Sequence, residues 1–259
     1  MGVARRADGS AGDADYGHIG VDYSKYRQPD AAIAALITDA LDGARSVVNL
    51  GAGAGSYGPT DRTVTPVEPS ATMRRQRPAH LPDAVDAYAE HLPFADKAFD
   101  AALATFTVHQ WADLAAGLAE VRRVTRGPIV VLSCDPTELS KFWLDDYAPE
   151  VLATEALRYP PIDRLTALLG VRSTVTGVPI PLHCSDGFGE AYYGRPEALL
   201  DPGARKAMSA WSFVTPDVHA RFEATLTADV ASGAWDAKYG HLRREPTFDG
   251  SLKLIVGHP

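Results

Sequence analysis

Short apolar runs and amphipathic segments alternate along the first half of the chain. The segments 30–41 and 113–124 place their apolar residues at helical spacing, so we expect helices there. The shorter runs, rich in valine, leucine and alanine, are expected to form strands at 46–50, 63–68, 83–87, 99–105 and 128–134. Strands that alternate with helices in this way predict a parallel sheet with right-handed crossovers.

The pattern changes after Asp135-Pro136. Residues 137–168 are expected to be helical, and two further strands are expected at 171–179 and 251–257. The stretch between those strands is mostly helical in pattern. We therefore predict an α/β fold, with a seven-stranded, mostly parallel sheet, helices on both faces and a helical cap over the strand carboxyl ends.

A glycine-rich turn follows the first expected strand. Gly51, Gly53 and Gly55 can adopt positive φ and let a ligand approach bare backbone, and a following helix would offer unpaired N–H groups. Glu68 ends the second strand, where one carboxylate can accept hydrogen bonds from both hydroxyls of a ribose. The sequence thus favours an adenosyl cofactor, although a purely structural turn stays open.

The sixth position of the glycine motif separates two cofactor classes. A dinucleotide site prefers glycine or alanine there, whereas this chain has Ser56. This favours S-adenosylmethionine over NAD. Ser70 can cap a helix whose Met73 then faces an adenine, and the end of the fourth strand, Thr105-Phe106, converges on the same edge.

As a set, these motifs resemble the class I S-adenosylmethionine-dependent methyltransferases, in particular the small-molecule methyltransferase-domain group of type 11. The resemblance covers roughly residues 20 to 135 and implies a Rossmann-like core. In the family the glycine loop receives the methionine part, the acid at Glu68 binds the ribose, and Tyr88-Ala89-Glu90 borders the adenine. The cofactor residues so expected are Tyr23, Arg27, Gly51, Ala52, Gly53, Gly55, Glu68, Pro69, Ser70, Met73, Tyr88, Ala89, Glu90, Thr105 and Phe106.

The chain departs from the family pattern at three places. Asn49 stands where relatives often have an acid, and Tyr88 where many have aspartate. The segment 56–63 leaves room for little more than one helical turn, and Pro59 shortens it further. Relatives also carry a Tyr-x-x-x-Arg element, matched by Tyr23 and Arg27, whose arginine can bind the cofactor carboxylate. A surface pair between Arg27 and Asp30 is the alternative.

The expected reaction is direct, in-line methyl transfer to a small-molecule acceptor. His109, at the end of the fourth strand, is the candidate base, and Asp135 is a weaker candidate for orienting the substrate or base. A structural histidine is equally compatible with the sequence. A protein that binds the cofactor without methyl transfer, or an NAD-dependent oxidoreductase, remains an alternative.

Composition restricts the partners. The 259-residue chain carries a formal charge of −8, and its one basic cluster, 74–77, is too short for a nucleic-acid groove. Its two cysteines are expected to be free thiols in a reducing, cytoplasmic setting, and no metal-ligand spacing or membrane segment is evident.

We divide the chain into a disordered leader (1–20), a cofactor-binding core (21–135), and a part with the lid helices, the last two strands and the cap (136–259). The acceptor and the oligomeric state stay open.

Aromatic residues are frequent in the expected cap. They line a substrate pocket or form the cap's own core, and the sequence does not separate these alternatives. The residues are Tyr192, Tyr193, Trp211, Phe213, Trp235 and Tyr239.

Overall fold

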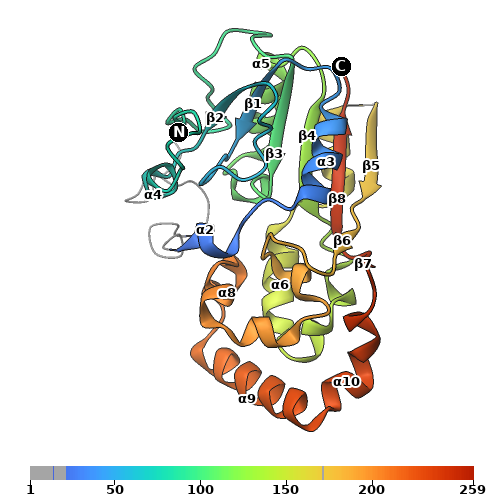
Figure 1. Ribbon diagram of the computed structural model, residues 1–259. Coiled ribbons are helices and arrows are strands. Elements are labelled where there is room, and N and C mark those ends of the chain that lie inside the picture. The colour runs from blue at the N-terminus through green and yellow to red at the C-terminus, as the bar shows by residue number, and fades with distance from the viewer. Residues whose placement is uncertain (1–13, 15–21, 171) are drawn as a thin grey trace.

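A computed structural model describes Ala14 and residues 22–170 and 172–259. The expected leader, 1–20, lies outside the described residues except for Ala14. The central sheet has six strands in the order β2-β1-β3-β4-β8-β5 (Figure 1). Their bounds are Ser46–Leu50 (β1), Thr63–Val67 (β2), Ala101–Thr105 (β3), Ile129–Cys134 (β4), Ser173–Gly177 (β5) and Leu252–Gly257 (β8). The first four strands run parallel, and β8 pairs antiparallel with both β4 and β5.

The strand expected at 83–87 does not form, so the sheet has six strands instead of seven. Only Val85 bridges to Val67, through hydrogen bonds with the main chain of β2 and Glu68. Pro82 and two flanking aspartates, residue types that are rare in strands, account for this short pairing. The segment still lies beside the end of β2.

Helices cover both faces of the sheet, as the sequence predicts. Helix α3 (Ala31–Ala40) packs through Ile33 and Ile37 against alternate strand residues such as Val47. Helices α5 (Leu114–Val124) and α7 (Ile162–Leu169) pack on the opposite face, against the intervening residues such as Val48. This alternation is the period of two expected for a sheet buried on both faces.

The second half of the chain builds a helical cap at one end of the sheet (Figure 1). Its α-helices are α6 (Pro149–Arg158), α8 (Pro202–Lys206), α9 (Pro216–Ser232) and α10 (Ala234–Tyr239), and a two-stranded ribbon pairs β6 (Ile180–Pro181) with β7 (Thr247–Phe248). Short 3₁₀ helices connect them: Leu139–Lys141, Trp143–Asp146, Gly189–Tyr192, Pro196–Leu200, Ser209–Phe213 and Gly240–Arg243.

The cap has an aromatic core of its own. Trp211, Trp235 and Tyr193 are fully buried, and the Trp143 indole donates a hydrogen bond to the carbonyl of Tyr193 at 2.9 Å. None of the six cap aromatic residues named from the sequence lines either of the two pockets described below. All of them except Phe213, which is exposed, pack in the core of the cap.

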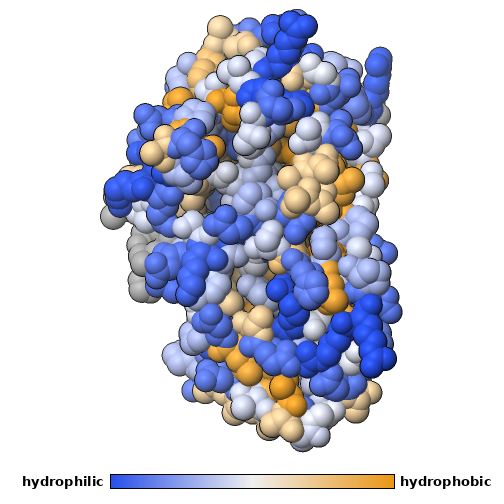
Figure 2. Space-filling model, viewed as in Figure 1, coloured by the Kyte–Doolittle hydropathy of each residue, from blue (hydrophilic) through white to orange (hydrophobic). Residues whose placement is uncertain are grey.

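Exposed apolar side chains are scattered over the part of the surface that the structure describes. The face seen in Figure 2 is mostly hydrophilic, with separate apolar groups, and the exposed large apolar residues come from different elements: Leu36, Leu157, Leu168, Val175 and Phe213. Within the described ranges, every helix is too short or too polar to cross a membrane. Cys134 and Cys184 are both buried free thiols, as expected.

Candidate functional site

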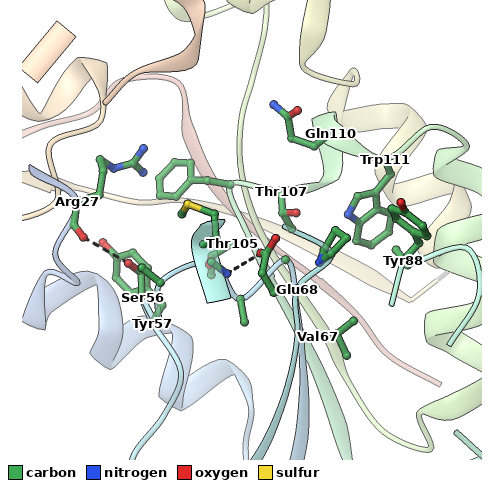
Figure 3. A pocket seen from close by; sticks show the side chains of 18 of the residues that line it. Arg27, Ser56, Tyr57, Val67, Glu68, Tyr88, Thr105, Thr107, Gln110 and Trp111 are labelled. Atoms are coloured by element: carbon green, nitrogen blue, oxygen red, sulfur yellow. Dashed lines mark hydrogen bonds between the residues drawn. The ribbon is translucent and has the colours of Figure 1, made fainter. Parts of the chain in front are cut away.

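A pocket with an empty volume of about 880 Å³ opens at the carboxyl ends of β1, β2 and β3. Figure 3 shows the order of its side chains: Arg27, Ser56 and Tyr57 at one end, Glu68 in the middle, and Tyr88 with Trp111 at the other end. The pocket is therefore polar and charged at one end and aromatic at the other.

The glycine loop forms the floor near the middle of this pocket. Gly51 and Gly53 have φ of 61° and 51°, and a Cβ atom at Gly51 would lie 2.0 Å from the Thr107 hydroxyl. The chain between β1 and β2 forms turns, so it does not offer the helix N–H groups expected from the sequence. Within this loop, the Gly53 amide donates a hydrogen bond to Glu68 Oε2 at 2.8 Å. Arg77 braces the loop by donating to the carbonyl of Gly53 at 3.2 Å.

Glu68 is buried and held rigidly. Its Oε1 accepts a hydrogen bond from the Ser70 amide at 2.8 Å, while Oε2 accepts from the Gly53 amide. Burial raises the pKa of Glu68 to about 6, although these two amides oppose the shift. Each carboxylate oxygen has a second lone pair, so the group can accept two further hydrogen bonds from a ligand.

The aromatic end is fixed by helix α5. Trp111 follows the short 3₁₀ helix η1 (Val108–Gln110), and a Cβ atom at Gly117 would lie 2.5 Å from its ring. Glu90 accepts a hydrogen bond from the Asp113 amide at 3.1 Å, next to the start of α5. Tyr88 lies beside the indole (Figure 3). The two aromatic side chains can enclose a flat ring system.

The charged end joins three distant parts of the chain. Arg27 forms a buried ion pair with Asp186, and the Tyr57 hydroxyl donates to the same carboxylate at 3.1 Å. The Arg27 guanidinium lies 5.4 Å from the ring centroid of Tyr23 and 5.1 Å from that of Phe106. The expected alternative, a pair with Asp30, does not form.

Asp30 instead caps a helix and contacts the cap. Its side chain caps helix α3 by accepting from the amides of Ala32 at 3.0 Å and Ile33 at 3.4 Å, and it also accepts from the Ser185 amide at 3.1 Å. The same carboxylate thus starts a helix and ties the cap loop to the core.

A second, smaller cavity of about 400 Å³ shares a wall with the first. The shared residues are Tyr23, Arg27 and Phe106. His109 lines this second cavity, with its ring centroid 4.5 Å from that of Tyr159. The remaining lining residues are Glu155, Tyr159, Phe188, Gly189, Ala207, Met208 and Ser209.

Most residues expected to bind the cofactor line the larger pocket: Tyr23, Arg27, Gly51, Ala52, Gly53, Glu68, Pro69, Met73, Tyr88, Ala89, Glu90, Thr105 and Phe106. Gly55 does not line it and packs toward Leu81, while Ser70 caps α4 (Ala71–Arg75). Asp135 accepts hydrogen bonds from Thr137 and lines neither cavity.

Sequence reasoning missed several lining residues. Ser56, Tyr57, Thr107, Gln110 and Trp111 lie within the motifs themselves, so their positions next to the glycine loop and the fourth strand were a usable signal. Asp186 and Glu155 come from the cap, and no local motif marks them. Among the described residues no group of three or more His, Cys, Asp or Glu could hold a metal ion.

Comparison with known proteins identifies the core. Residues 48–128 match the family model of the methyltransferase domain. A protein from Anabaena variabilis, assigned as a methyltransferase of an antibiotic biosynthesis pathway, has a crystal structure that matches with a TM-score of 0.84 and 30% identity. That match covers 90% of this chain and 99% of that one.

More distant relatives agree on the fold. An S-adenosylmethionine-dependent methyltransferase from Thermotoga maritima matches with a TM-score of 0.56 and 16% identity, over 94% of this chain and 97% of that one. The uncharacterized protein YafE of Escherichia coli is 45% identical over 47 residues, which span 17% of this chain and 23% of that relative. On the domain match and the Anabaena relative, the chain belongs to the class I S-adenosylmethionine-dependent methyltransferases.

Proposed function

We propose that the protein transfers a methyl group from S-adenosylmethionine to a small-molecule acceptor by in-line displacement, with the cofactor in the larger pocket. One observation carries this proposal: the pocket presents an arginine, a glutamate and an aromatic pair in that order (Figure 3), and the arginine is paired with Asp186. The cofactor has an amino-acid group, a ribose and an adenine in the same order. The fit of charge and shape therefore extends along its whole length.

Glu68 is the proposed ribose ligand. Its two backbone hydrogen bonds fix the carboxylate, and its remaining lone pairs suit a pair of neighbouring hydroxyls. Tyr88 and Trp111 would enclose the adenine at the far end, and Met73 would contact it from the loop side.

Arg27 and Asp186 are proposed to hold the amino-acid end of the cofactor. The guanidinium suits the carboxylate, and Asp186 suits the ammonium group. Relatives often carry an acid at the position of Asn49, which is neutral in this chain. We propose that the cap supplies the missing negative charge through Asp186.

The sulfonium supplies an already activated methyl group, so the main task of the chain is positioning. Holding a nucleophile in line with the breaking bond can contribute about 7 to 11 kcal/mol. The second cavity adjoins the larger pocket through Tyr23, Arg27 and Phe106, so an acceptor in it would approach the methyl group on sulfur from this side. His109 in this cavity remains the proposed base from the sequence.

Two observations support a small acceptor. The chain is acidic overall, and the Anabaena relative is assigned to an antibiotic biosynthesis pathway. Nucleic acid, which needs a basic surface, fits neither of these. Asp135 can act on the acceptor only indirectly, since it lines neither cavity.

Calorimetric titration tests the cofactor assignment. We expect S-adenosylhomocysteine to bind saturably and NAD not to bind, and Glu68→Ala to weaken binding by about tenfold or more, which equals about 1.4 kcal/mol. Glu150→Ala removes an acid whose carboxylate instead pairs with Arg221 on the surface and serves as the matched control. Preference for NAD, or equal binding by the Glu68 variant, would overturn the assignment.

A further inference from the structure

Glu155 is a partly buried acid that the proposed cofactor site does not use. It lies on helix α6 and lines the second cavity. Within residues 22–170 and 172–259, its carboxyl oxygens make no hydrogen bond and no ion pair with another side chain or amide. Burial raises the pKa of Glu155 to about 7, even though the positive charges of Arg158 and Arg27 oppose this shift.

Neighbouring acids, unlike Glu155, accept hydrogen bonds from protein donors. Glu190 accepts hydrogen bonds from the amide of Ser251 at 2.8 Å and from its hydroxyl at 2.8 Å. Asp186 accepts from Arg27 and from Tyr57. A partly buried carboxyl group that lines a cavity without a protein donor is free to accept a hydrogen bond from a ligand there.

The position of Glu155 places that ligand next to the methyl donor. Tyr23, Arg27 and Phe106 line both cavities, and Phe106 packs on Phe188 with ring centroids 5.1 Å apart. A molecule in the second cavity therefore lies next to the proposed cofactor site, and its nucleophile has to reach the methyl group between these three side chains.

We propose that the second cavity is the acceptor site, and that the acceptor is a small amine or hydroxyl compound whose N–H or O–H group donates to Glu155. This inference rests on the proposed function. As the nucleophile attacks, the carbon–sulfur bond breaks and its electron pair stays on sulfur, while a new carbon–nitrogen or carbon–oxygen bond forms. The proton of the nucleophile passes to the Glu155 carboxylate and then to solvent, so in this proposal Glu155 takes the role of base that the sequence suggested for His109.

The charges around Glu155 restrict the acceptor further. Arg27 is already paired with Asp186, and Arg158 donates to the Ser209 hydroxyl at 2.8 Å. An acceptor oxygen that is itself anionic would meet the Glu155 carboxylate, so carboxylates and phosphates are disfavoured. The titratable and charged groups that face Glu155 from the surrounding elements are Tyr23, Arg27, His109, Cys134, Arg158, Tyr159 and Glu190.

A methyl-transfer assay tests the inference. Purified protein with tritiated-methyl S-adenosylmethionine would be offered a panel of small amines, phenols, alcohols, carboxylates and phosphates. We expect methylation only of amines or hydroxyl compounds. Glu155→Gln should lower kcat/KM by about 100-fold, in the range of a lost general base, and remove the acid limb of the pH–rate profile near pH 7.

Matched variants separate this role from a structural one. Glu155→Asp should restore part of the rate and the acid limb, because it keeps the carboxylate. Glu150→Gln makes the same chemical change on the same helix, at a surface pair with Arg221, and should leave the profile unchanged. S-adenosylhomocysteine should bind Glu155→Gln as tightly as it binds the wild type, because Glu155 lines only the second cavity.

Each contrary result has a distinct meaning. Methylation of carboxylates alone, an unchanged pH–rate profile in Glu155→Gln, or no methylation of any protic compound by protein that binds S-adenosylhomocysteine would overturn the acceptor assignment. Failure to bind S-adenosylhomocysteine would overturn the proposed function itself.

Discussion

At the scale of single residues, Glu68 shows how burial and backbone together prepare a ligand site. The two amides that hold it come from the glycine loop and from Ser70, so the loop, the strand end and the following helix meet at one carboxylate. Burial raises its pKa to about 6, within the range where a modest change of pH alters its charge.

This shift predicts how affinity depends on pH. In the proposed complex the ionised carboxylate accepts hydrogen bonds from the ribose hydroxyls, so the affinity for S-adenosylhomocysteine should fall as pH drops through about 6. Between pH 7.5 and pH 5 we expect a loss of about tenfold, since one pH unit below the pKa leaves about a tenth of the group ionised. Glu68→Gln should bind weakly at both values. Calorimetry across this range measures the effect, and a flat profile in the wild type would contradict it.

The stability of the free protein should respond in the opposite direction. A raised carboxyl pKa in the folded state means that Glu68 costs stability as pH rises from its unfolded value, 4.5, to about 6. Acidification through this window therefore relieves the cost of Glu68 while it weakens binding, and the two effects can be separated by comparing wild type with Glu68→Gln in thermal unfolding.

Residues inside continuous motifs were the ones that could be predicted from sequence. Gly51, Gly53 and Glu68 line the pocket because a strand end and a tight turn fix their places locally. Gly55 belongs to the same motif but turns toward Leu81, since its direction depends on the irregular chain that replaces a helix. His109 lines the second cavity, which no local pattern could define.

At the scale of elements, helix α5 positions the aromatic end of the pocket through a single glycine. Gly117 lies in the helix interior, where alanine would favour the helix by about 1 kcal/mol. Its Cβ atom, however, would lie 2.5 Å from the ring of Trp111. The glycine therefore lets the indole lie against the helix.

Gly117→Ala should lower the affinity for the cofactor product while it changes the stability of the fold little. We expect the unfolding free energy to change by less than about 1 kcal/mol, because the helix propensity gained offsets the lost packing. The affinity for S-adenosylhomocysteine should fall by about tenfold, because the added methyl group displaces the Trp111 indole at the proposed adenine site. Denaturant unfolding and calorimetry measure the two quantities, and an unaltered affinity would show that Trp111 does not contact the ligand.

The bounds of helices and strands with a regular spacing of apolar residues were predicted within a residue or two. The strand predicted at 83–87 does not form, and the cause is local. The strands at 46–50 and 129–134 are mostly apolar and almost entirely buried, whereas 83–87 is interrupted by aspartates beyond the edge of β2. Such a segment gains one bridge from the sheet but lacks the apolar faces that extend a strand.

At the scale of the whole molecule, the cap and the core meet at the charged end of the pocket. Arg27 and Asp186 are 159 positions apart in the chain, and both are largely buried. Tyr57 and Ser185 add hydrogen bonds across the same junction. No sequence pattern links such distant positions, so the partner of Arg27 could be found only in the structure.

Asp186→Asn should destabilise the fold. Removing one charge of a buried pair leaves Arg27 without its counter-charge, and we expect the unfolding free energy to fall by about 3 kcal/mol. Asp61→Asn disrupts an exposed pair with Arg62 and should cost less than about 1 kcal/mol. Chemical denaturation of both variants measures the difference, and the double variant Arg27→Gln/Asp186→Asn should recover part of the loss. Equal stability of Asp186→Asn and wild type would contradict a structural role for the pair.

The central claim is that one pocket holds the whole cofactor in a single orientation, and a crystal structure of the complex with S-adenosylhomocysteine tests it most directly. We predict the ribose hydroxyls on Glu68, the adenine between Tyr88 and Trp111, and the amino-acid group at Arg27 and Asp186, with the sulfur facing the wall of the second cavity. A ligand bound in the reverse direction, or outside this pocket, would contradict the account.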